Sequence, residues 1–169
     1  MDAIDARLGR RSVRSFLEKE VSFELIEKLL EAGAAAPSAC NKAPVDFYAV
    51  TNKEVLARLD RSGMFTKMPS PLIIVVVGNT KRALPRSLSE YWIQDAAAAT
   101  ENILVMATAL GLSSCWNGVY PQRRVMERVS EILSLDEGSI PFAIIHIGYS
   151  EKAPEPHSGY DKIRVKFIK

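Results

Sequence analysis

Four arginines crowd into the first fourteen residues, where they could bind a phosphate group. They are Arg7, Arg10, Arg11 and Arg14, and Ser12 places a hydroxyl among them. A guanidinium presents a planar fork of hydrogen-bond donors that matches phosphate oxygens, and a serine hydroxyl adds one more donor. The alternative interpretation is a charged face that contacts only water, and the cluster alone does not separate the two.

Two further segments combine small and polar residues. Residues 36–44 read APSACNKAP, so amide and hydroxyl groups stand between two prolines. Such a rigid polar turn can position a ligand, although an ordinary connection from a helix to a strand has the same composition. Residues 111–118 read GLSSCWNG, and small residues there would let the backbone approach a flat ligand closely. The alternative for this segment is a glycine that ends a helix, followed by a core tryptophan.

The cysteines and histidines show no spacing typical of a metal site or a catalytic pair. Cys40 and Cys115 lie far apart and form no CxxC motif, so we interpret them as small packing residues in a reducing cytoplasm. His146 stands in an apolar strand pattern and is expected in the core, whereas His157 is expected to contact solvent. We therefore predict no metal ligand and no catalytic side chain.

Alternating helices and strands must position these segments. Helices are expected at 2–8, from Ser22 to a stop between Gly33 and Pro37, at 53–59, within 85–112 and at 121–133. Strands are expected at 45–51, 72–77 and 140–147, with an extended or looped stretch at 113–119 and a short edge strand at 163–168. This order predicts a layered α+β or α/β protein.

Composition narrows the class of protein. The chain has 169 residues, of which 47% are hydrophobic, and a formal net charge of +2. The length predicts one domain over residues 1–169, and the near-neutral charge argues against nucleic acid as a partner. Residues 1–14 are too charged for a signal peptide, and the aliphatic run at 72–77 is too short to span a membrane. We expect a cytoplasmic protein.

Taken in chain order, these segments resemble the nitroreductase family of flavin-dependent oxidoreductases. Residues 10–16 are similar to that family's RRSxRxF start, and residues 36–47 to its APSAxNxQPWxF segment. Residues 95–116 resemble its DxxxAxxNxxLxAxxxGLGSCW helix and loop, and residues 147–149 match its IGY strand end. The motifs span nearly the whole chain in the expected order.

The resemblance implies a fold and an assembly. It implies a three-layer α+β fold with a central, mostly antiparallel or mixed sheet flanked by helices. It also implies an obligate homodimer with an FMN at each end of the subunit interface, in which the C-terminal segment can be exchanged between subunits. Part of the apolar surface around Trp92, which we place in the core or the dimer interface, would then face the second subunit.

The resemblance also implies which residues hold the FMN. Arginines of the first motif would hold the phosphate, while Arg14 would lie near the N1–O2 edge of the flavin. Residues 114–117 would line the ring through backbone groups, and residues of the 36–41 turn would come from the other subunit. The full implied set is Arg10, Arg11, Ser12, Arg14, Pro37, Ser38, Asn41, Ser114, Cys115, Trp116, Asn117, Lys162 and Arg164.

Two departures from the family pattern bear on the flavin contacts. Residues 43–45 read Ala-Pro-Val where the family has Gln-Pro-Trp, so one polar contact to the flavin is missing unless Lys42 replaces it. Ser113 stands where the family has the second glycine of GLGSCW. The chain is also short for the family, which suggests that it lacks the insertion that covers the flavin in larger members.

The resemblance implies an enzyme that takes hydride from NADH or NADPH and passes it to a flat, electron-poor acceptor, a nitroaromatic or a quinone, by a ping-pong mechanism. The cofactor would carry the chemistry, so no Rossmann fingerprint and no catalytic side chain are needed. Two alternatives stay open. One is an FMN-binding storage or redox-sensing protein with little turnover, and the other is a specialised reductive enzyme of the same fold, such as a dehalogenase or a flavin-destroying enzyme.

Overall fold

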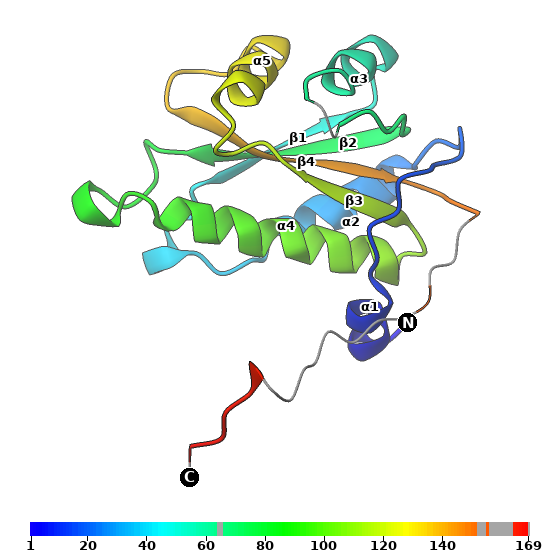
Figure 1. The fold of residues 1–169 in the computed structure, drawn as a ribbon, viewed down its shortest axis with the longest axis horizontal. Helices are drawn as coiled ribbons and strands as arrows, with labels where there is room; N and C mark the ends of the chain where they lie inside the picture. The colour runs from blue at the N-terminus through cyan, green and yellow to red at the C-terminus, as the bar shows by residue number, and fades with distance from the viewer. Residues whose placement is uncertain (64–65, 152–154, 156–163, 169) are drawn as a thin grey trace.

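A four-stranded antiparallel sheet forms the middle layer of the structure (Figure 1). The computed structural model describes residues 1–63, 66–151, 155 and 164–168. The strands are β1 (Val45–Val50), β2 (Leu72–Asn79), β3 (Ser113–Gly118) and β4 (Ser139–Gly148). Their order is β1-β2-β4-β3, so β1 and β3 are the two edges of the sheet.

The two central strands are buried because they are apolar along their whole length. All residues from Leu72 to Gly78 in β2 are buried, as the continuous aliphatic run predicts for a strand covered on both faces. In β4, the eight residues from Pro141 to Gly148 are buried as well. These strands are the rigid frame to which the edge strand β3 is attached.

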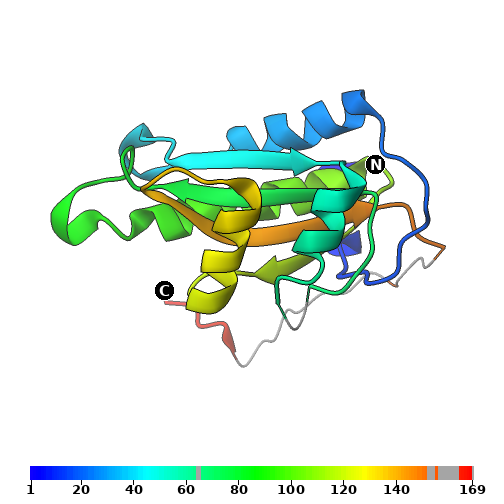
Figure 2. The same ribbon diagram turned by 90° about the horizontal axis from the view of Figure 1, so that it is seen from above.

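Helices cover both faces of the sheet (Figure 2). On one face lie α2 (Phe23–Ala34) and α4 (Tyr91–Ala109), and α1 (Ala3–Gly9) packs against α4. On the other face lie α3 (Lys53–Leu59) and α5 (Arg123–Leu133), and short 3-10 turns occur at Ala39–Asn41 and Arg86–Leu88. The expected three-layer α+β fold is confirmed. Within the described residues, no helix is both long enough and apolar enough to cross a membrane.

Trp92 fixes the distance between α4 and the sheet. Its side chain is 4% exposed and packs edge-to-face against Tyr120 and Phe142, with ring centroids 5.2 and 6.2 Å away. The indole ring lies directly over Gly78 of β2, where a Cβ atom would stand only 2.1 Å from the nearest ring carbon. Of the two places expected for Trp92, the described chain puts it in the core.

Helix starts follow the local sequence signals. Asp2 caps α1 by accepting a hydrogen bond from the Asp5 amide, and Asn52 caps α3 by accepting from Glu54 and Val55. Ser22 is the N-cap residue of α2, as predicted, although its side chain makes no capping hydrogen bond. The segment 113–119, expected as extended or looped, is the edge strand β3.

The prediction of an edge strand at 163–168 is wrong for the residues of this segment that the structure describes. Residues 164–168 contain no strand, and Ile163 lies outside the described residues. The apolar residues of this tail pair with no sheet edge, and Phe167 and Ile168 are 79% and 98% exposed. Alternating apolar residues suit a strand, but a strand forms only where an edge offers its backbone hydrogen bonds.

Candidate cofactor site

A cleft of about 530 Å³ lies beside the edge strand β3, at the start of α5. Its walls come from the N-terminal segment, the loop between α3 and β2, the end of β3 and the first turn of α5. The lining residues are Arg14, Gly63, Thr66, Lys67, Met68, Trp116, Asn117, Gly118, Gln122 and Val125. The volume falls in the range of about 300–1,000 Å³ that is typical of small-molecule and cofactor sites.

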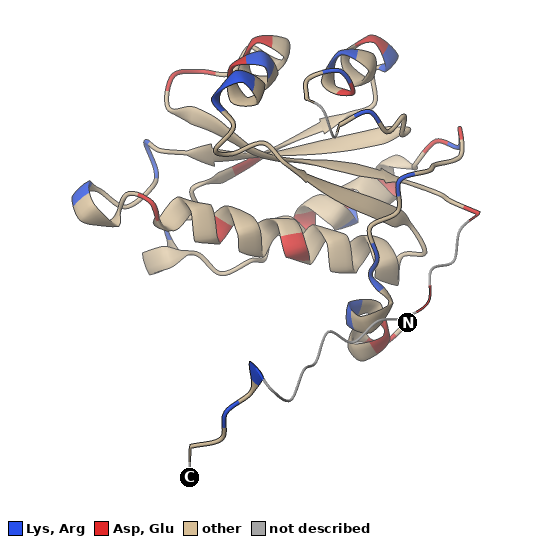
Figure 3. Cartoon of the chain, viewed as in Figure 1, with Lys and Arg blue, Asp and Glu red and all other residues tan. Residues whose placement is uncertain are grey.

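The N-terminal segment runs along β3 and is bonded to it. The Val13 amide donates to the Ser114 carbonyl at 2.9 Å, and Ser12 forms an isolated bridge with Ser114. Farther along, the Leu17 amide donates to the carbonyl of Tyr149 at 2.8 Å. These bonds hold Arg14 at the cleft, and Figure 3 shows the basic positions of this segment passing beside the edge of the sheet.

Buried donors at this edge have no partner within the described chain. The Asn117 amide nitrogen and the Ser114 hydroxyl are both buried and form no hydrogen bond. Buried polar groups are almost always hydrogen-bonded, so an unpaired amide in the wall of a cleft favours a ligand that accepts a hydrogen bond there. Asn117 therefore marks a polar recognition point in the wall of the cleft.

Arg10 is partly buried and pairs with an acidic residue of α4. Its Nε lies 3.4 Å from a carboxylate oxygen of Glu101, and Arg7 also pairs with that carboxylate. The Arg10 side chain is 28% exposed, and its Nε makes no hydrogen bond. Glu101 thus orients Arg10 on the α4 side of the sheet edge, while Arg14 faces the cleft.

Cys115 lies in β3, directly before the cleft residue Trp116, and is buried. Burial raises the pKa of its thiol above the usual value, while the charge of Arg14 and a hydrogen bond with Ser12 act in the opposite direction. A thiol held in its neutral form is a poor nucleophile. The interpretation as a packing residue therefore agrees with the surroundings of Cys115, but it is wrong for Cys40, which is exposed.

The loop between α3 and β2 carries Lys67 into the cleft. The Asp60 carboxylate accepts from the Met68 amide at 2.7 Å, and the Thr66 hydroxyl bonds the backbone of Gly63. Burial raises the pKa of Asp60, although the bond from Met68 opposes that shift. Asp60 is thus a positioning residue that fixes this loop against the end of α3.

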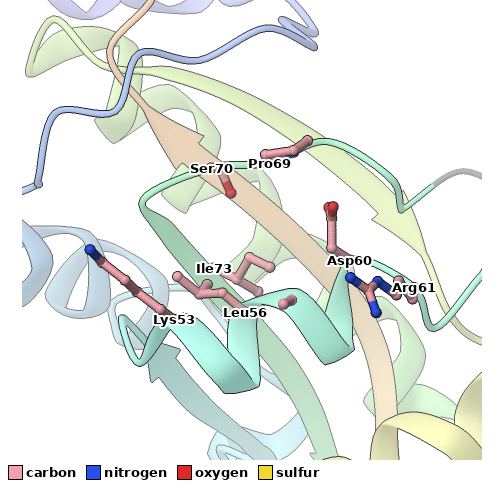
Figure 4. A pocket seen from close by; sticks show the side chains of 8 residues that line it. Lys53, Leu56, Asp60, Arg61, Pro69, Ser70 and Ile73 are labelled. Carbon is pink, nitrogen blue, oxygen red and sulfur yellow. The ribbon is translucent and has the colours of Figure 1, made fainter.

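A separate pocket of about 320 Å³ lies behind the same loop (Figure 4). Its floor is apolar, with Leu56 from α3 and Ile73 from β2, and Lys53 and Arg61 stand at opposite ends of the helix. Ser70 at its wall contacts the buried His146, with Oγ 3.0 Å from Nδ1. Asp60 also lines this pocket, and its carboxylate is bonded to the Met68 amide of the loop.

The polar turn 36–44 lies at the other edge of the sheet. Its Ser38 hydroxyl accepts from the Ala43 amide at 2.9 Å, and Asp95 of α4 accepts from the Ala39 amide at 2.9 Å. The turn leads directly into β1, which is the edge opposite β3. Positive φ angles at Cys40, Asn41 and Ala43 show that side-chain bonds hold it in a conformation that most residues avoid.

These features can be compared with known families. A sequence model of the nitroreductase family matches residues 8–64 and 61–149. The chain belongs to the nitroreductase family.

Relatives of this nitroreductase-family chain span its whole length. A candidate NADH dehydrogenase/NAD(P)H nitroreductase of Methanothermobacter thermautotrophicus is 34% identical over 100% of this chain and 88% of its own. A solved structure of a protein with the same description from Parabacteroides distasonis is 31% identical, with a TM-score of 0.92 over 99% of this chain and 98% of its own. An FMN-dependent nitroreductase from Clostridium difficile is 29% identical, with a TM-score of 0.87 over 98% and 99%.

The structure brings some of the predicted site residues together at the cleft and places the others away from it. Arg14, Trp116 and Asn117 line the cleft, and Ser12, Ser114 and Cys115 do not line it but adjoin these residues, with Ser12 in contact with both Ser114 and Cys115. Arg10 and Arg11 belong to the segment beside the cleft without lining it. The turn with Pro37, Ser38 and Asn41 lies at the opposite edge of the same sheet. Arg164 does not line the cleft, and Lys162 lies outside the described residues.

Sequence reasoning missed the contribution of the loop between α3 and β2. Thr66, Lys67 and Met68 line the cleft, and so do Gln122 and Val125 at the start of α5. The loop carries no motif that points to a ligand, because its approach to β3 depends on the Asp60–Met68 bond. The only local signal is the cluster of prolines and Ser70 after Lys67, which predicts an irregular segment without placing it.

His146 gives the fold a pH dependence. It is fully buried, and burial lowers the pKa of the imidazole from 6.5 to about 4. Between those values the unfolded chain binds a proton that the folded chain excludes, so the free energy of unfolding falls as pH drops from 6.5. We expect a loss of about 2 kcal/mol between about pH 7 and pH 5.

Urea unfolding of the protein and of His146→Gln at both pH values measures this effect. The difference between the two proteins isolates the imidazole of His146, because all other titratable groups are present in both proteins. The free energy of unfolding of His146→Gln is expected not to show this decrease between pH 7 and pH 5, whatever its value at pH 7. An equal loss in both proteins would show that His146 is protonated in the fold.

Proposed function

We propose that the chain is an FMN-dependent NAD(P)H oxidoreductase whose flavin binds in the cleft beside β3. The observation that carries this proposal is the unpaired, buried amide of Asn117 in a cleft of about 530 Å³. A flavin ring has a row of carbonyl and nitrogen acceptors along one edge, which such a donor would satisfy. An FMN-dependent relative 29% identical to this chain over nearly all of its length supports the same cofactor.

The residues of the cleft suit the chemistry of that cofactor. Bound FMN would accept a hydride from NAD(P)H and deliver it to an electron-poor acceptor. Arg14 and Lys67 both line the cleft and bring two positive charges to it. Positive charge there favours a cofactor that gains negative charge on reduction, so these side chains would raise its reduction potential.

The remaining members of the predicted site fit a homodimer. Pro37, Ser38 and Asn41 lie at the sheet edge opposite the cleft, so they would complete a cleft on a second copy. Exposed apolar side chains support such a contact, among them Ile4 of α1 and Phe23 of α2 at 69% each. The exposed Phe167 would pack on the partner if the C-terminal segment is exchanged. Light scattering should then give twice the mass of one chain.

The phosphate of FMN would be held from the N-terminal segment. Arg10 and Arg11 belong to the segment that leads to Arg14 in the cleft, and Ser12 of this segment forms a bridge with Ser114 of β3. Glu101 aligns Arg10 and keeps it beside the sheet edge. Lys162 and Arg164 are further candidates for the same phosphate. Residues 1–169 would thus form one flavin-binding domain, of which two copies make two sites.

Steady-state kinetics test the activity. With FMN bound, NAD(P)H oxidation should require an added nitroaromatic or quinone acceptor. Double-reciprocal plots at several acceptor concentrations should give parallel lines, because in this proposal donor and acceptor occupy the same cleft in turn. Tight FMN binding without NAD(P)H oxidation by any acceptor would contradict the enzyme and favour the storage or redox-sensing alternative.

A further inference from the structure

Three arginines line a hollow between α3 and α5 that the proposed FMN site does not use. The hollow measures about 320 Å³ and is lined by Arg58, Arg61 and Arg128 together with Glu131 and Ile132. All three arginines are exposed, and in the part of the chain that the structure describes none of them forms a salt bridge. Three positive charges thus face one carboxylate, which favours an anionic ligand.

The hollow and the cleft are separate cavities that are lined by neighbouring residues of the same two segments. On α5, Gln122 and Val125 line the cleft, and Arg128 and Ile132 line the hollow. Spacings of three and four residues put these side chains on one stripe of the helix, and Val125 and Arg128 are about 4.5 Å apart along its axis. On the other wall, Arg61 of the hollow is only two residues from Gly63 of the cleft.

A nicotinamide coenzyme has the shape and the charge that this pair of cavities fits. Its nicotinamide is joined through one ribose to a diphosphate, which carries negative charge, and NADPH carries a further phosphate on its second ribose. A nicotinamide placed in the cleft would leave the diphosphate to continue along the α5 stripe toward the arginines. Figure 3 shows basic positions on both α3 and α5, and guanidinium forks pair with phosphate oxygens through two parallel hydrogen bonds.

We propose that Arg58, Arg61 and Arg128 bind the phosphate groups of NAD(P)H while its nicotinamide lies in the cleft. This inference rests on the proposed function, because it takes the cleft as the place where hydride is transferred. The arginines act on coenzyme affinity and leave hydride transfer itself unchanged. The arginines therefore do not change the affinity for hydride donors that lack phosphate.

The test compares two hydride donors on the FMN-loaded protein. One is NADH or NADPH, and the other is 1-benzyl-1,4-dihydronicotinamide, which has the same reactive ring and no phosphate. The variants are Arg58→Ala, Arg128→Ala and the double variant. Arg124→Ala is the matched control, because Arg124 is an exposed arginine of α5 that does not line the hollow.

We expect the double variant to raise KM for NAD(P)H at least tenfold, with kcat and the kinetics of the phosphate-free donor within twofold of the parent. Each single variant should raise KM at least threefold, and Arg124→Ala should not change it. Arg58 and Arg128 are exposed, so equal thermal melting of the variants is expected. An unchanged KM for both NADH and NADPH in the double variant would overturn the proposal.

A binding measurement separates this proposal from the proposed function. ADP-ribose and its 2′-phosphate carry the phosphates of NADH and NADPH without the nicotinamide, and calorimetry detects their binding without turnover. Suppose that the parent protein oxidises neither donor but binds ADP-ribose, and that the double variant does not bind it. The proposed oxidoreductase activity is then wrong and the arginine site stands. If the parent oxidises both donors and binds neither ADP-ribose compound, the arginine site is wrong and the oxidoreductase stands.

Discussion

Arg14→Ala is expected to weaken FMN binding at least tenfold. Arg14 lines the cleft, and the bond from the Val13 amide to Ser114 keeps it there. A hydrogen bond from a charged group is worth about 1.5–3 kcal/mol, which corresponds to roughly 10- to 150-fold in affinity. Titration of the apoprotein with FMN, followed by quenching of flavin fluorescence, measures the effect.

Two companion variants sharpen the Arg14 experiment. Arg14→Lys keeps the charge and loses the planar fork, so an intermediate affinity is expected. Lys28→Ala removes one positive charge from the exposed face of α2, far from the cleft in the fold, and should leave the affinity unchanged. Arg10→Ala should also weaken binding at least tenfold if Arg10 holds the phosphate. An unchanged affinity in both Arg10→Ala and Arg14→Ala would show that the N-terminal motif does not hold FMN.

Gly78→Ala should destabilise the fold by about 3 kcal/mol or more. An added Cβ would lie 2.1, 2.5 and 2.8 Å from three carbons of the Trp92 ring, well inside van der Waals contact. The ring cannot turn away freely, because Tyr120 and Phe142 pack against it. Overpacking of a well-filled core costs about 1–3 kcal/mol and occasionally more. The lost stability should lower Tm by roughly 6–12 °C.

Matched variants separate this clash from the general effect of replacing glycine. Gly9→Ala adds the same methyl group where the nearest atom, in Thr108, is 3.7 Å away, so it should be neutral or slightly stabilising. Trp92→Ala alone removes a buried ring and is expected to cost about 3–5 kcal/mol. The double variant Gly78→Ala/Trp92→Ala should cost less than the two single changes added, because the clash disappears with the ring. A Gly78→Ala protein as stable as the parent would contradict the close packing of α4 on β2.

Most elements of the fold could be predicted because their signals are local. The helix expected at 53–59 has those bounds in the structure, since Asn52 caps it and Leu59 anchors it in the core. The buried strand expected at 72–77 is β2, which extends two residues farther because Asn79 still pairs with β4. The segment 113–119 gave a less definite prediction, because β3 is stabilised chiefly by its hydrogen bonds to β4.

The residues of the site also differ in whether local sequence signals could predict them. The basic N-terminal motif and the segment around Trp116 stand out in the sequence, and both meet at the cleft. Lys67 reaches the cleft only through the bond of Asp60 to Met68, and such a contact leaves no periodic pattern. The turn around Ser38 lies at the far edge because of the order of the strands in the sheet. The sequence of a single strand does not reveal that order.

The absorption spectrum of the purified protein tests the central claim most directly. After incubation with FMN and removal of unbound cofactor, the protein should be yellow, with the two visible absorption bands of a bound flavin. Addition of NADH or NADPH without oxygen should bleach the longer-wavelength band, and a quinone should restore it. A protein that stays colourless after incubation with FMN, or a bound flavin that neither coenzyme bleaches, would contradict the account.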